Sequence, residues 1–251
     1  MGLLLRDPQR NRTSWVRNDP TTMSVMEHLE DLRRALIIVI VAWLVSSVVA
    51  WFFTVDMLRF ITHRAGLGSL VSLQPTEMFM VRFKIALAAG TLVASPVIFW
   101  QLWWFVSPVL RIRQRRATLV LIAATVFFFL LGVAVCFFAL PLIMHVLTGF
   151  APSGIMQYVP RANDFLGFLL GLCVAFGVVF ELPVVLWTLG MLGIISSAWL
   201  WKNRLYWILG LGLVANFMTP GGDPLITPLV VFVPLLIFYL GSMLLLKLSG
   251  K

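Results

Sequence analysis

One long uncharged stretch constrains this chain more than any other feature. Residues 117–140, ATLVLIAATVFFFLLGVAVCFFAL, carry no charged side chain over 24 positions. As a helix rising ~1.5 Å per residue, the stretch would exceed the ~30 Å hydrocarbon core of a bilayer. A soluble domain keeps about a quarter of its residues charged. Only 12% are charged here and 61% are hydrophobic, so the sequence predicts a polytopic membrane protein.

Further apolar runs predict five more transmembrane helices, giving an all-α domain of six. The fifth run, LYWILGLGLVANFM, has 14 residues, and the sixth contains Pro228 and Pro234. We therefore expect the last two helices to be short and to cross a thinned or protein-shielded part of the bilayer. The five runs are about 35–54, 77–105, 165–192, 205–218 and 228–246.

The cations predict the orientation. With the N-terminus inside, 14 of the 19 Lys and Arg residues fall on the inner side, so both termini are predicted to be cytoplasmic. The cations gather at the ends of apolar runs, so the net charge of +9 does not indicate nucleic-acid binding. We expect a flexible tail over 1–22 without a cleaved signal peptide, one domain over 23–246 and a cytoplasmic tail over 247–251. The outer loops, about 55–76 and 141–164, are predicted to cap the domain on the membrane surface.

Motifs of soluble catalysis are missing from the sequence. It has no Gly-rich phosphate loop and no GxSxG, HExxH or CxxC. Cys136 and Cys173 lie in apolar runs as packing residues, and the three histidines lack metal-ligand spacing. We therefore predict that the chain is not an enzyme and has no catalytic residue, cofactor or metal.

One carboxyl group lies inside an apolar run. Glu181 falls within VAFGVVFELPVVLWTLG, residues 174–190. An ionisable side chain in a span costs about 2.5–3.5 kcal/mol on insertion scales, so it faces protein or water and marks a functional candidate. Pro183 frees a backbone carbonyl nearby, which leaves a purely structural role as a hydrogen-bonded kink as the alternative.

Four motifs, in order, resemble those of the TatC family, the multispanning receptors of the twin-arginine protein translocase. They are MEHLEDLRRAL (26–36), FVSPVLRIRQRR (105–116), AFGVVFELPV (175–184) and FMTPGGDP (217–224). The resemblance implies a glove-shaped bundle of six helices. Each motif alone is weak, and their order at the predicted span boundaries is what carries the resemblance.

The resemblance also implies site residues. The signal-peptide site would include Glu30, Asp31, Arg33, Phe105, Pro108 and Gln114; the intramembrane polar site Glu181 and Pro183; and an outer loop Asp223. Two positions depart from the family pattern. Gln114 stands where the family normally has a glutamate that recognises the signal peptide's arginines, and Leu240 where an acidic residue is expected after the tyrosine.

As for function, the resemblance implies the receptor and core of a translocase that exports folded proteins using the proton-motive force. Its partners would be single-span subunits of the TatA and TatB type near the last two helices, twin-arginine signal peptides, further copies of itself and the lipid bilayer. Its location would be the cytoplasmic (inner) membrane or an equivalent energy-coupling membrane. Two alternatives stay open: a degenerate paralogue serving as a structural subunit of another membrane complex, and a proton-coupled small-solute transporter. A transporter would need more than one intramembrane ionisable group, and Glu181 is nearly alone.

Overall fold

The described part of the chain is helical. A computed structural model describes residues 25–106, 115–149, 159–218 and 226–248, and within these ranges the only β pairing is an isolated bridge between Val71 and Arg161. The prediction of an all-α fold is confirmed. The helices are α1 (Val25–Trp51), α2 (Thr54–Arg64), α3 (Pro75–Val106), α4 (Arg115–Gly149), α5 (Ala162–Phe180), α6 (Leu182–Met191), α7 (Ser197–Lys202), α8 (Arg204–Met218) and α9 (Ile226–Leu248).

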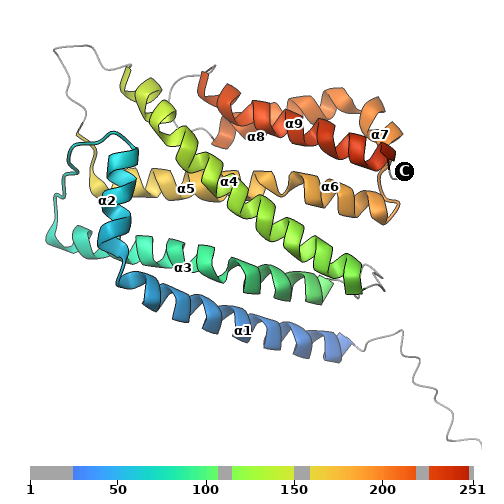
Figure 1. Cartoon of the computed structure of the whole chain (residues 1–251), viewed down its shortest axis with the longest axis horizontal. Coiled ribbons are helices and arrows are strands. Elements are labelled where there is room, and N and C mark those ends of the chain that lie inside the picture. Colours follow the sequence, from blue (N-terminus) through green and yellow to red (C-terminus); the bar gives the residue numbers. More distant parts are fainter. Residues whose placement is uncertain (1–24, 107–114, 150–158, 219–225, 249–251) are drawn as a thin grey trace, which may run out of the picture.

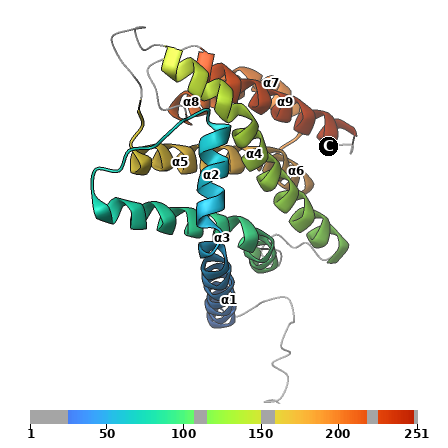
Figure 2. The same ribbon diagram turned by 60° about the vertical axis from the view of Figure 1, so that its left-hand side comes forward.

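The long helices form a splayed bundle. In Figures 1 and 2, α1 lies beside α3, α4 crosses obliquely, α5 and α6 follow one line, and α8 pairs with α9. Helix α2 runs across the direction of α1 and α3 (Figure 1). We call the end of the bundle that carries α2 the outer end, following the predicted orientation. The start of α1 and the end of α9 share the opposite, inner end (Figure 1), as both termini on one side require.

Four helical segments are long and apolar enough to cross a bilayer. Helix α8 has 15 residues, in agreement with the short fifth run, whereas α9 has 23 residues and contains Pro234. The four segments are His28–Trp51, Pro75–Val106, Thr118–Gly149 and Ala162–Met191.

The predicted start of the second outer loop is wrong. We expected a loop from residue 141, whereas α4 continues through Pro141 to Gly149. Pro141 has no N–H to offer the carbonyl of Phe137 one turn earlier. The side chain of Arg64, from α2, donates from Nε to that carbonyl at 3.3 Å. Because a donor from another helix replaces the missing one, the chain stays helical past the proline.

A second proline is tolerated for a similar reason. Pro96 lies inside the 32-residue α3 and leaves the carbonyl of Leu92 without its usual partner. The hydroxyl of Ser95 donates to this carbonyl at 2.7 Å. The helix therefore crosses Pro96 without exposing a backbone acceptor to lipid.

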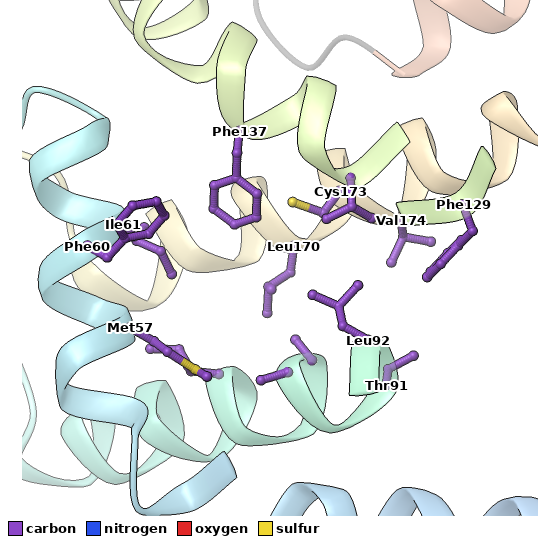
Figure 3. A pocket seen from close by; sticks show the side chains of 14 residues that line it. Met57, Phe60, Ile61, Thr91, Leu92, Phe129, Phe137, Leu170, Cys173 and Val174 are labelled. Carbon is purple, nitrogen blue, oxygen red and sulfur yellow. The ribbon is translucent and has the colours of Figure 1, made fainter. Parts of the chain in front are cut away.

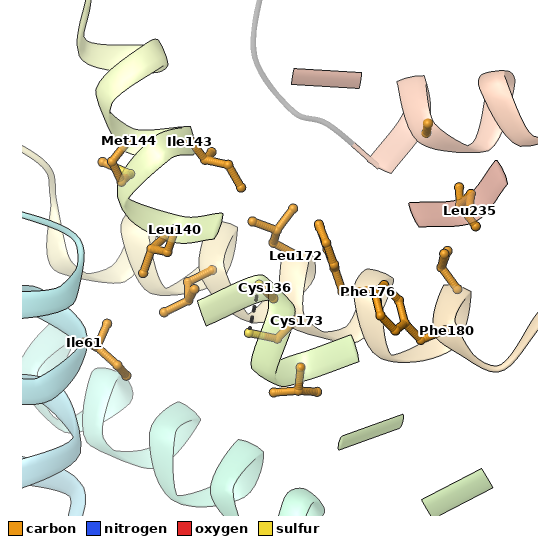
Figure 4. Packing of buried hydrophobic residues seen from close by; sticks show 14 of the residues in the cluster. Ile61, Cys136, Leu140, Ile143, Met144, Leu172, Cys173, Phe176, Phe180 and Leu235 are labelled. Atoms are coloured by element: carbon orange, nitrogen blue, oxygen red, sulfur yellow. Dashed lines mark hydrogen bonds between the residues drawn. The ribbon is translucent and has the colours of Figure 1, made fainter. Parts of the chain in front are cut away.

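Glycines allow the helices to approach closely. A Cβ placed on Gly132 of α4 would lie 2.6 Å from the carbonyl oxygen of Phe176 in α5, so only glycine fits there. One turn away, Cys136 and Cys173 are buried free thiols with their sulfurs 3.4 Å apart (Figure 4). This crossing of α4 and α5 lies in the main buried cluster of the bundle.

A buried carboxylate joins the two outer loops. Glu77, at the start of α3 and 5% exposed, accepts from the backbone N–H of Leu73 at 3.0 Å and of Asn163 at 3.1 Å. Arg161 adds an ion pair, with Nε 3.2 Å from Oε1 of Glu77. The backbone of Val71 bonds to both Pro160 and Ala162. Segments far apart in the sequence thus meet at one point, which fixes the outer end of α3 against that of α5.

Candidate functional site

The predicted signal-peptide residues of α1 lie around a surface cavity near the inner end. Glu30, Asp31 and Arg33 are exposed and surround a cavity of about 640 Å³ together with Arg34, Ile37 and Ile38. The acids are nearer the start of the helix, the cations follow, and the isoleucines continue into the span. The cavity therefore changes from anionic to cationic to apolar along less than three turns.

The carboxylates are available to an incoming cation. Among the described side chains, neither Glu30 nor Asp31 forms an ion pair. Both lie in the second turn of α1 and are exposed. Arg33 and Arg34 follow Glu30 by three and four residues on the same helix.

Phe105 reaches this site from another helix. At the end of α3 its ring stacks on His28 of α1, with ring centroids 4.2 Å apart and an interplanar angle of 15°. The stack places the end of α3 beside the start of α1. The sequence showed only that His28 lacks metal-ligand spacing, and nothing in it could reveal this contact. Pro108 and Gln114 lie outside the described residues.

Glu181 lies at a break between two helices. It is the single residue between Phe180, the last of α5, and Leu182, the first of α6, with φ −72° and ψ −13°. Pro183 occupies the first turn of α6, where its missing N–H would have no partner in any case. The predicted kink is thus a junction between two helices that follow one line (Figure 1).

The carboxyl group of Glu181 faces α4. It interacts with the Thr125 hydroxyl and the backbone of Phe129, while its Oε1 is buried without a hydrogen-bond partner among the described residues. Thr125 also accepts from Nε1 of Trp103 in α3 at 2.8 Å. A polar contact therefore links α3, α4 and the α5–α6 junction. The sequence did not indicate Thr125, because a threonine can satisfy its hydroxyl within its own helix.

Helix α9 carries Leu240, the residue at which the family pattern has an acidic side chain. Tyr239 is 1% exposed and donates from its hydroxyl to the carbonyl of Leu200 in α7 at 2.7 Å. Leu240, the next residue, is exposed, as suits an apolar side chain facing lipid. Asp223 lies outside the described residues.

These features define a polytopic helical membrane protein with an acidic-to-apolar cavity at one membrane face and a carboxyl group within the bilayer. The family model for the Sec-independent protein translocase protein (TatC) matches residues 27–234. The chain belongs to the TatC family.

Curated relatives and solved structures agree. The Sec-independent protein translocase protein TatC of Carboxydothermus hydrogenoformans is 36% identical, covering 90% of this chain and 93% of the relative. That of Aquifex aeolicus is 33% identical, covering 91% and 97%. A crystal structure of the twin-arginine translocase receptor TatC superimposes with a TM-score of 0.74 at 32% identity, covering 90% of this chain and all of that one.

Proposed function

We propose that this chain is the membrane receptor of a twin-arginine translocase and that it recognises signal peptides at the cavity on α1. The observation that carries the proposal is the pair of exposed carboxylates, Glu30 and Asp31, which form no ion pair within the described residues and lie near Phe105 in a chain of the TatC family. Of the three functions that the sequence allowed, the comparisons support this one.

The cavity suits a peptide with two arginines followed by an apolar segment. A guanidinium offers a planar fork of donors to a carboxylate, and the contact is charge-assisted. Arg33 and Arg34 would repel the arginines of a peptide placed one turn deeper, which sets the register. Ile37 and Ile38 would then receive the apolar segment at the level where the span begins.

Glu181 is proposed as the contact for a partner helix. Its buried Oε1 has no hydrogen-bond donor in the described part of the chain, and a single-span subunit of the TatA or TatB type could supply one. The exposed faces of α8 and α9 are the proposed docking surface for such subunits. We place the complex in the cytoplasmic (inner) membrane or an equivalent energy-coupling membrane, exporting folded proteins with the proton-motive force.

Peptide titration tests the receptor function. A labelled twin-arginine signal peptide is titrated against the detergent-solubilised chain and against Asp31→Asn and Glu30→Gln. Each substitution should weaken binding by ~1 kcal/mol, or about fivefold, because a charged hydrogen bond becomes a neutral one. Asp56→Asn is the matched control, since Asp56 lies on α2 at the outer end. Equal affinities for the control and both site variants would contradict the proposal.

A further inference from the structure

An apolar cavity lies within the outer half of the bundle. It has a volume of about 270 Å³ and lies between α2, α3, α4 and α5 (Figure 3). Thr91 is the one polar lining residue, and its hydroxyl is already used: it donates to Leu87 and accepts from Trp43. The other lining residues are Met57, Phe60, Ile61, Ile85, Ala88, Ala89, Leu92, Phe129, Val133, Phe137, Leu170, Cys173 and Val174.

The cavity is open to its surroundings at the level of the bilayer. Phe60 and Val174, on two of its sides, are 61% and 62% exposed. Water has no polar partners on such walls, and an empty apolar space destabilises a fold in proportion to its volume. We therefore expect an apolar group to fill this cavity in a membrane.

The lining of the cavity favours a plain hydrocarbon occupant. Its walls come from four helices and offer one polar side chain, Thr91, whose hydroxyl is already bonded. A lipid acyl chain has no polar group of its own to satisfy, and the surrounding bilayer supplies it.

A cation marks the outer edge of the cavity. Met57, Ile61 and Arg64 follow one another at helical spacing along one face of α2. Nε of Arg64 bonds to the Phe137 carbonyl, and its guanidinium carbon lies 5.3 Å from the ring centroid of Phe138. Within the described ranges Arg64 pairs with no carboxylate. Arg59 differs, because its side chain is 79% exposed and lies 3.7 Å from Asp56.

We propose that this cavity binds an acyl chain of an anionic phospholipid from the outer leaflet, whose phosphate contacts Arg64. The apolar walls take the chain, and the donors of Arg64 that the Phe137 carbonyl does not use meet the phosphate. A guanidinium holds a phosphate with paired hydrogen bonds, and the ammonium group of a zwitterionic headgroup would be repelled by Arg64, so the site should prefer anionic lipid. The site is independent of signal-peptide recognition, which we place at the inner end.

Photocrosslinking tests the site on the full chain in detergent micelles. The probe is a phosphatidylglycerol with a photoreactive group near the end of one acyl chain, and labelled residues are located by mass spectrometry. Labels should fall on Leu92, Leu170 and Val174. A phosphatidylethanolamine probe with the same chains should label them about fivefold less, the effect expected of one cation near the headgroups.

Variants of the chain distinguish the effect of the charge on Arg64 from that of the shape of the cavity. Arg64→Gln keeps a donor for the Phe137 carbonyl and should reduce labelling by phosphatidylglycerol to the level of the zwitterionic probe, whereas Arg64→Lys should retain most of it. Ala88→Leu should fill the cavity and reduce labelling by both probes. Arg59→Gln is the matched control and should behave as the wild type. Equal labelling by the two probes in the wild type, labels outside the cavity, or labelling of these residues by a single-span peptide in place of lipid would each overturn the proposal.

Discussion

The outer clamp around Glu77 should contribute several kcal/mol to stability, and Glu77→Gln measures it. Its carboxylate receives backbone donors from Leu73 and Asn163 and the Nε of Arg161. A hydrogen bond to a charged group is worth about 1.5–3 kcal/mol, against ~1 for a neutral one. The glutamine also turns an NH₂ donor toward groups that themselves donate. Loss of charge on three bonds, together with this mismatch, gives ~3 kcal/mol.

Thermal unfolding in detergent is the assay. For a chain of this size, ~3 kcal/mol corresponds to a fall in Tm of about 6–12 °C. Asp164→Asn is the matched control, because Asp164 is an exposed acid in the first turn of α5, and it should shift Tm by less than ~2 °C. If Glu77→Gln melted at the same temperature as Asp164→Asn, the reasoning about the clamp would be refuted.

Three further predictions concern function and topology. Restoring the missing anion with Gln114→Glu should strengthen twin-arginine peptide binding by about fivefold, with the gain shrinking as salt rises, in the same titration. Glu181→Gln should preserve folding and weaken partner-dependent export, and Glu181→Leu should weaken export further; wild-type export by Glu181→Leu would remove Glu181 from the account. Reporter fusions after residues 66, 154 and 222 should read outside and those after 113, 202 and 251 inside, and an inside signal after 222 would reject the short fifth span.

The transmembrane helices were predictable because the thickness of the hydrocarbon core sets how many consecutive apolar residues each helix needs. The uncharged run from residue 117 is long enough to require a transmembrane helix, and the fifth run, with 14 residues, could form only a short one. The end of α4 was not predictable. Whether Pro141 stops the helix depends on the guanidinium of Arg64, which comes from a different helix. The expectation that proline ends a helix considers only that helix, so it cannot take account of a hydrogen-bond donor from another helix.

The polar sites were likewise predictable only in part. Glu30, Asp31 and Glu181 stood out because carboxylates are conspicuous beside or inside an apolar run. The partners that complete the sites, His28 for Phe105 and Thr125 for Glu181, did not, because an aromatic stack or a hydroxyl contact between helices leaves no periodic pattern.

A crosslink from the α1 cavity tests the central claim most directly. A photoreactive residue replacing Ile37, which lines the cavity beyond the acidic turn, is introduced into the full chain in detergent and exposed to a twin-arginine signal peptide. The account predicts a crosslink to the apolar segment just after the two arginines. Replacing both arginines by lysines should abolish most of it, since lysine lacks the planar fork. An equal yield with the lysine peptide, or no crosslink to a preparation shown to be folded, would contradict recognition at this cavity.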